Sequence, residues 1–212
     1  MRYSANQVAA SRDALLRAAA RTFREKGYTG VGVDELARQA GVTSGSFYKH
    51  FLGKSDALLE VVKAGVDRVA KRVGSVKAMK RSVGGSWVDD FATLHTSDEH
   101  RRSMGMGCNL TTLSVEVARA APDVRAAFEQ SILDAIAEMT DGEPLAGEAD
   151  GQERAIAILS VLTGAMVIAR AVGSEKTAQM ITESARRAAL LIADTPLPDR
   201  PRTSAHWTPN DY

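Results

Sequence analysis

Apolar residues recur at spacings of three and four along most of this chain, a period that predicts α-helices. A first helix is predicted over residues 12–26 and ends at Gly27. Two short helices, over 33–40 and 44–51, are then separated by a turn at Gly41. The chain shows no convincing strand pattern, so the predicted fold class is all-α.

The rest of the chain has the same helical character. Further helices are predicted over 55–73, 87–94, 97–102, 110–118, from Pro122 to about Met139, 152–172 and 174–194. Gly74 and the pair Gly84-Gly85 interrupt the pattern, and the basic segment 71–81 is either an extension of the preceding helix or a mobile connector. In the helix that opens at Pro122, the residues expected to face inward are Val124, Phe128, Ile132, Leu133, Ile136 and Met139.

The two short helices carry the clearest functional signal. Thr43 is a plausible N-cap of the second one, and Phe47 and Phe51 lie four residues apart on its inner face. Its outer face is left with Ser44, Gly45, Ser46, Tyr48, Lys49 and His50. This pattern is typical of a helix-turn-helix, whose second helix enters the DNA major groove. The alternative is a short surface helix in an ordinary helical hairpin.

The charge distribution favours DNA over that alternative. The overall net charge is +1, but residues 1–85 hold 16 Lys and Arg against 7 Asp and Glu, a net of +9, whereas residues 86–212 hold 11 against 19, a net of −8. The basic half is the half that contains the two short helices. Cations there would release counterions from phosphates and supply non-specific affinity for double-stranded DNA.

The order of these features resembles the N-terminal domain of the tetracycline-repressor (TetR) family of bacterial regulators. The resemblance covers about 50 residues, from Arg12 to Val62, and is carried by Phe23, Gly27, Tyr28, Val33, Leu36, Ala37, Ala40-Gly41-Val42, Phe47-Tyr48, His50-Phe51, Lys54 and Leu58-Leu59. In one departure, Gly32 stands where the family usually has a hydroxyl residue, so a phosphate contact would be missing or moved to Thr29. The expected DNA-binding residues are Thr29, Thr43, Ser44, Gly45, Ser46, Tyr48, Lys49, His50 and Lys54.

The resemblance also implies a domain organisation. Residues 1–54 would form the DNA-binding domain and 55–195 a larger domain for effector binding and dimerisation, followed by an extended or disordered Pro-rich tail over 196–212. In the family the last two helices of each subunit build a four-helix dimer interface, so a homodimer on a palindromic operator is expected. The alternative is that these helices close a monomeric core.

The middle helices would then hold an effector pocket. The candidate lining residues are Trp87, Phe91, Met104, Met106, Cys108, Leu113, Phe128, Met139, Leu162 and Met166. Because thioethers adapt to irregular apolar ligands and few polar groups accompany them, the pattern favours a small lipophilic effector. Each of these residues could equally be plain core.

Other chemistries are weaker alternatives. Cys108 is the only cysteine and lies near Arg101 and Arg102, so a redox- or electrophile-sensing repressor is a second hypothesis. The group His95, Asp98, Glu99 and His100 lacks a recognisable metal-binding spacing, so no metal or cofactor is expected. A helical enzyme or a purely structural dimer is disfavoured because P-loop, Rossmann, nucleophile-elbow and zincin motifs are missing.

The sequence also predicts the compartment. No secretion signal follows the start, and a single cysteine suits a reducing cytosol. The apolar stretch from Ala155 to Ala169 spans 15 residues, which is short for a membrane span and normal for a buried helix. We therefore predict a cytoplasmic protein, most simply a repressor that a small effector releases from DNA.

Overall fold

The computed structural model describes residues 5–146 and 150–198, and all regular elements in these ranges are helical. The elements are α1 (Ala5–Lys26), α2 (Val33–Gln39), α3 (Ser44–Phe47), α4 (Lys54–Val83), α5 (Trp87–His95), α6 (Asp98–Arg102), the 3₁₀ turn η1 (Met104–Met106), α7 (Asn109–Thr112), α8 (Ser114–Ala118), α9 (Pro122–Thr140), α10 (Gly151–Ala171) and α11 (Glu175–Asp194). The predicted all-α class is confirmed. Of the tail expected to be extended or disordered, residues 199–212 lie outside the described ranges.

The helix-turn-helix forms for the local reasons that its sequence indicates. Gly41 adopts φ 72°, the left-handed conformation that lets the chain turn between α2 and α3. The Thr43 hydroxyl caps α3 by accepting a hydrogen bond from the Ser46 N–H at 3.2 Å. Phe47 and Phe51 are buried and their rings pack 5.2 Å apart, which fixes the inner face of α3 on the core.

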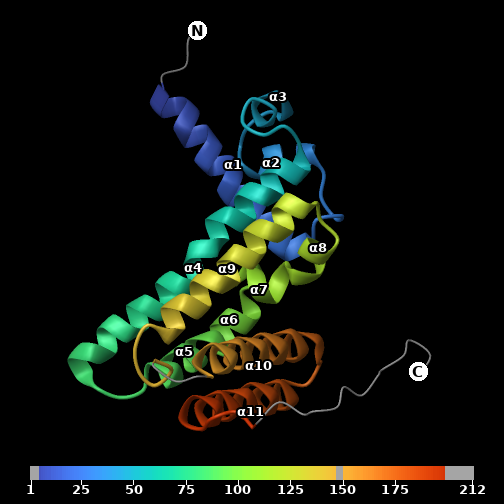
Figure 1. Cartoon of the computed structure of the whole chain (residues 1–212). Helices are drawn as coiled ribbons and strands as arrows, with labels where there is room; N and C mark the ends of the chain where they lie inside the picture. The colour runs from blue at the N-terminus through green and yellow to red at the C-terminus, as the bar shows by residue number, and fades with distance from the viewer. Residues whose placement is uncertain (1–4, 147–149, 199–212) are drawn as a thin grey trace.

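Helix α4 connects the two ends of the molecule. Figure 1 shows it running from the region of α1–α3 to the region of α5, α10 and α11, with α9 alongside it. The structure decides between the two alternatives for segment 71–81, because α4 passes through Gly74, runs from Lys54 to Val83 and turns only at Gly84, where φ is 77°. The basic segment 71–81 is therefore helical. Buried Val73 and Val76 hold it against the core, and one Gly in a packed helix costs only about 1 kcal/mol.

Two apolar clusters lie at opposite ends of α4. The N-terminal cluster joins α1–α3 to the start of α4 and also takes in Leu113, Val117 and Val124 from α7–α9. The second cluster joins the far end of α4 to α5, α9, α10 and α11. Because residues from both halves of the chain share the first cluster, helices α1–α3 are packed onto the larger helical region and not only connected to it by the chain.

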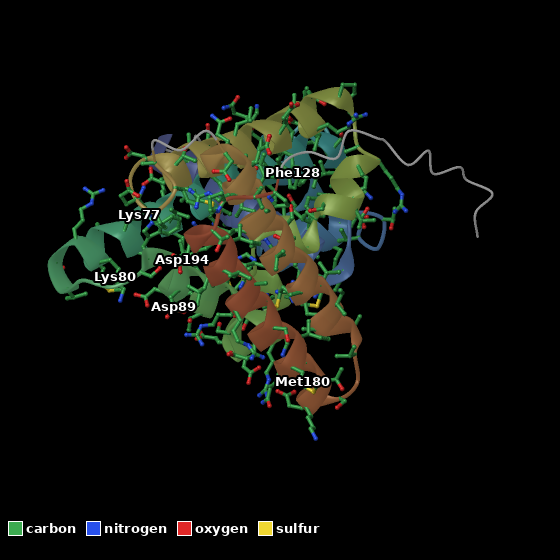
Figure 2. All side chains as sticks on the ribbon, turned by 60° about the horizontal axis from the view of Figure 1, so that its bottom comes forward. Lys77, Lys80, Asp89, Phe128, Met180 and Asp194 are labelled. Carbon is green, nitrogen blue, oxygen red and sulfur yellow. The ribbon has the colours of Figure 1, made fainter. Side chains whose placement is uncertain are left out.

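Helices α10 and α11 pack side by side at the end opposite α3 (Figure 1). Alanines at positions 178, 185, 189 and 193 form the buried stripe of α11, and their small side chains permit close helix approach. A salt bridge of 2.7 Å between Arg186 and Asp89 fastens α11 to α5. Helix α5 is in turn bound to α4, because Asp90 pairs with Lys80 at 2.9 Å. Figure 2 shows Asp89 and Lys80 near one end of the α10–α11 pair and Met180 at the other.

Two further expectations differ from the structure. The predicted helix over 110–118 is split into α7 and α8, because the chain bends at Leu113, which is fully buried in the N-terminal cluster. Leu133, expected on the inner face of α9, is 51% exposed. Its neighbours Val124, Ile136 and Met139 are buried as predicted, so the inner stripe of α9 is narrower than its apolar sequence suggests.

We predict opposite effects on stability for two glycines of the helix-turn-helix. Gly41→Ala should lower the free energy of unfolding by about 1–2 kcal/mol, because a Cβ disfavours the left-handed conformation. Gly45→Ala should raise it by up to about 1 kcal/mol, because Gly45 is helical and a Cβ there would meet only the Thr43 hydroxyl at 3.9 Å. Urea unfolding of both variants measures this, and equal effects would contradict the assignment of the turn.

Candidate DNA interface and effector cavity

The second helix of the motif presents a polar, basic surface. Tyr48 is 60% exposed and Lys49 and Gly45 are also exposed, whereas Ser44, Ser46 and His50 are half-buried. The Ser44 hydroxyl donates to an Asp34 carboxylate oxygen at 2.5 Å, and the Ser46 hydroxyl lies 3.4 Å from that of Ser11. Thr29 is exposed in the loop before α2. Gly45, Tyr48 and Lys49 therefore form the exposed part of this surface, whereas the hydroxyls of Ser44 and Ser46 are engaged within the domain.

Lys54 binds the backbone of the loop that precedes α2. Its Nζ donates to the carbonyls of Tyr28 and Val31 at 2.9 and 3.0 Å and lies 4.2 Å from the centre of the Tyr28 ring. A lysine held by two carbonyls and an aromatic face positions the loop that carries Thr29. A direct contact between Lys54 and DNA stays a prediction.

An ion cluster fixes α2. Glu35 accepts hydrogen bonds from Arg38, Gln39 and Lys26. These bonds, led by that from Gln39, lower the pKa of Glu35 to about 2, so it is ionised at neutral pH. The carboxylate thus offsets some of the local positive charge while it locks α2 beside α1.

A second candidate site lies in the larger region of the fold. A cavity of about 860 Å³, hereafter the α4–α6 cavity, opens between α4, α5, α6 and the turn at η1. It is lined by Arg68, Val69, Lys71, Arg72, Ser75, Val76, Phe91, Leu94, His95, Ser97, Glu99, His100, Ser103, Met106, Gly107 and Cys108. Its volume lies within the range of known small-molecule sites, and its walls are more polar and more basic than the predicted lipophilic pocket.

Only three of the residues predicted to bind an effector line this cavity. Phe91, Met106 and Cys108 line it. Trp87, Met139, Leu162 and Met166 are buried core side chains, and Leu113 is core of the N-terminal cluster. Met104 is exposed outside the lining, and Phe128 borders a more open depression of about 650 Å³ between α8 and α9. A helical pattern marks buried faces but not which buried faces leave a gap, so sequence reasoning missed His95, His100 and the cations of α4.

Two histidines form one wall of the cavity. The ring centres of His95 and His100 are 5.1 Å apart in an edge-to-face arrangement. His100 Nε2 accepts from the Cys108 backbone N–H at 3.2 Å, so its Nδ1 carries the proton and donates to the His95 carbonyl at 2.8 Å. Burial lowers the pKa of His100, which agrees with this neutral form.

His95 is more deeply buried than His100. It is only 3% exposed, and its Nε2 has no hydrogen-bond partner. Burial, reinforced by the charges of Arg72 and Arg170, lowers its pKa to about 3 and keeps the ring neutral at physiological pH. A buried polar atom without a partner is costly, so its presence in a cavity wall indicates a place where a ligand atom can bind.

The surroundings of Cys108 disfavour its thiolate form. Burial raises the pKa of its thiol, and the nearby charges of Arg24 and Arg72 only partly counteract this effect. Thiolates rather than thiols react with electrophiles, so the environment disfavours sensing by Cys108. Within the described ranges no cluster of three His, Cys, Asp or Glu side chains could hold a metal ion.

The cavity is linked directly to the DNA-binding region. Arg24 of α1 is 5% exposed and donates through Nε to Asn109 Oδ1 at 2.9 Å and through Nη1 to the Gly105 carbonyl at 3.1 Å. Gly105 and Asn109 immediately flank the lining segment 106–108. Burial, with a smaller effect from Arg68, lowers the pKa of Arg24 to about 10, so the guanidinium stays charged at neutral pH.

Two further contacts tie the regions together. Asn109 also donates to the Val61 carbonyl of α4 at 3.3 Å, an approach that requires Gly65, because a Cβ there would lie 1.9 Å from the Asn109 amide. Glu116 of α8 accepts from the Tyr28 backbone N–H at 3.2 Å. The first bond joins α7 to α4, and the second joins α8 to the loop that follows α1.

Comparison with known proteins agrees with the N-terminal geometry. Residues 15–61, which hold most of α1, all of α2 and α3 and the start of α4, match the family described as bacterial regulatory proteins, tetR family. The N-terminal segment of this chain, residues 15–61, therefore belongs to the tetR family of bacterial regulators. The transcriptional regulator AcuR of Cereibacter sphaeroides is 32% identical over 120 residues, which cover 54% of this chain and 52% of that protein. The match thus spans about half the length of this curated relative.

Solved structures extend the likeness to the whole fold. NemR of Escherichia coli in its reduced form superposes with a TM-score of 0.69 at 22% identity, over 88% of this chain and 98% of that one. The regulatory protein TetR from Rhodobacter sphaeroides gives a TM-score of 0.67 at 24% identity, over 84% and 97%. At these identities the likeness establishes the shared helical architecture. Contact between α3 and DNA stays a prediction, which the family match over residues 15–61 supports.

We predict that Tyr48→Ala and Lys49→Ala each weaken operator binding by about tenfold or more without changing thermal stability, since both side chains are exposed. Lys49→Ala should also reduce the slope of log K against log salt by about one per subunit if Lys49 contacts a phosphate. Lys176→Ala, which removes the same charge from α11, is the matched control and should bind normally. Wild-type binding that is insensitive to salt would contradict the DNA interface.

Proposed function

We propose that this tetR-family regulator is a cytoplasmic homodimeric repressor that binds a palindromic operator and leaves it when a small molecule enters the α4–α6 cavity. Regulators of this family bind DNA and small effectors and act as dimers. They are generally not enzymes, and the proposal requires neither enzymatic activity nor a cofactor. The observation that carries it is the pair of hydrogen bonds by which Arg24 of α1, the helix that packs on α2, holds Asn109 and Gly105 beside the cavity wall.

The dimer part of the proposal rests on the open apolar side of α10 and α11. Val167, Ile168 and Leu191 are 47%, 54% and 66% exposed, although they belong to two well-formed, otherwise packed helices. Alone among the described helices, α10 is long and apolar enough to cross a membrane, and 44% of its most apolar window is buried. Helix α10 is 21 residues long and so exceeds the 15-residue apolar stretch from Ala155 to Ala169. Because it packs on α9 and α11, we interpret it as a core helix whose exposed apolar side contacts a second copy of the chain.

The release mechanism is a shift between two arrangements of one connected unit. A ligand that displaces segment 106–108 would move the Gly105 carbonyl and Asn109, and Arg24 would carry that movement to α1. The two α3 helices of a dimer would then no longer match successive major grooves. The effector acts only through a higher affinity for the arrangement that does not fit the operator.

Electrophile sensing by Cys108 is the competing proposal. Cys108 lines the cavity, which favours it, but burial raises the pKa of the thiol, which disfavours attack on an electrophile. Cys108→Ser separates the two. A reversible effector should still release DNA from this variant, whereas an electrophile acting through the thiol should lose its effect.

The coupling path gives a direct test of the proposed function. Arg24→Met should keep operator binding and effector binding but lose most of the effector-induced release, because its bonds to Asn109 and Gly105 are gone. Arg21→Met, on the same helix but in an exposed pair with Glu25, should respond like the wild type. If Arg24→Met is insoluble, Arg24→Lys keeps the charge without the forked geometry. DNA shift with and without effector measures release, and full release from both Arg24 variants would contradict the path.

Assembly can be tested at the exposed side of α10. Ile168→Glu should shift the protein from about twice the 22.7 kDa chain mass to the monomer mass in sedimentation equilibrium, because two carboxylates would be buried near the two-fold axis. Val115→Glu on α8, where the native side chain is 64% exposed, is the control and should remain dimeric. A wild-type chain that sediments as a monomer at micromolar concentration would contradict the dimer.

A further inference from the structure

Resting on the proposed effector role of the α4–α6 cavity, we infer that its ligand is a small organic carboxylate, whose anionic group binds Arg68 and Arg72 and whose polar atoms reach His95. This assigns a ligand class to the cavity that neither the family nor the predicted lipophilic lining specifies.

The cations of α4 carry the first part of the inference. Arg68 and Arg72 both line the cavity and lie one helical turn apart, on the same face of α4. Neither forms an ion pair with a carboxylate among the described residues, although many exposed arginines of this protein do. Among the described residues of the lining, Glu99 is the one acid, and Arg68 and Arg72 outnumber it. A cavity with this balance attracts an anion, and guanidinium groups match the geometry of a carboxylate.

The unpartnered nitrogen of His95 carries the second part. His95 is only 3% exposed to solvent, and it lines the same cavity as the two arginines. Its neighbours are Phe91 on α5, His100 on α6 and the charges of Arg72 and Arg170, and none of these satisfies Nε2. Because the ring is neutral, it can offer a hydrogen bond to a ligand oxygen in one tautomer without a further charge.

The remaining lining residues indicate the chemistry of the other end of the ligand. Val69, Val76, Phe91 and Met106 provide apolar surface next to the polar groups. An aliphatic or aromatic chain fits this surface, so the ligand combines one anionic end with one apolar end. The depression between α8 and α9 has no comparable feature, since its lining contains one cation, Arg125, and one acid, Glu129, and none of its polar side chains is buried without a partner.

Matched acids and amides test the ligand class. Hexanoate and benzoate should raise the melting temperature in a concentration-dependent manner and bind in calorimetry, whereas hexanamide and benzamide should bind at least tenfold more weakly. Arg68→Gln combined with Arg72→Gln should weaken hexanoate binding at least tenfold and bring it close to that of the amide. Arg81→Gln, an exposed α4 residue outside the lining, is the matched control.

His95 is tested separately. His95→Phe keeps a buried ring beside Phe91 but removes the nitrogen, and it should weaken hexanoate binding by about fivefold to tenfold without lowering the melting temperature of the free protein. His95→Gln retains a polar group and should recover part of the affinity. If His95→Phe instead melts early, the Gln variant compared with His95→Leu gives the same contrast.

The outcomes separate this inference from the proposed function. Equal binding of acids and amides, or unchanged hexanoate binding in the double Arg variant, overturns the carboxylate assignment. In that case operator release by a non-ionic compound would leave the proposed function standing. Conversely, a carboxylate that binds through Arg68 and Arg72 but never alters DNA binding supports the ligand class and overturns the role of this cavity as an effector site.

Discussion

The buried guanidinium of Arg24 is the interaction on which the arrangement of this molecule depends. It leaves α1, within the DNA-binding region, and bonds to Asn109 and Gly105 beside the cavity wall. A buried charge that loses its partners costs several kcal/mol, so α1 and the η1–α7 segment move together or not at all. The helix-turn-helix is therefore oriented by the same residues that border the cavity.

Helix α4 completes this coupling because it belongs to both apolar clusters. Its first turns hold Leu58, Val61 and Val62 in the N-terminal cluster, and its later turns hold Val73 and Val76 in the second. Arg68 and Arg72 lie between these two regions. An anion bound there would act on the part of α4 that connects the two packed ends, next to the Val61 carbonyl that accepts from Asn109.

The cavity also shows how a regulator can combine a stable fold with a responsive site. Most of the second cluster is dry and densely packed around α10, with Ile158 and Leu162 fully buried. The cavity wall instead contains a histidine nitrogen without a hydrogen-bond partner, which the fold tolerates at a cost in stability, beside the exposed guanidinium groups of Arg68 and Arg72. A ligand can supply the hydrogen bond that such a polar group lacks. The free energy gained from this bond is then available to shift the conformation of the protein.

The sequence by itself determined the helical class, the helix-turn-helix and most helix boundaries, because local signals control them. Gly41 permits the turn between α2 and α3, Thr43 caps α3, and Phe47 and Phe51 form its buried face. Each of these features depends on only a few neighbouring residues. Only the tertiary structure decided that α4 continues through Gly74, that Leu113 is core, and that Phe91, Met106 and Cys108 share a cavity with His95 and the arginines of α4. Those outcomes depend on which faces meet across distant segments, and a periodic apolar pattern carries no information about where two packed faces leave a space.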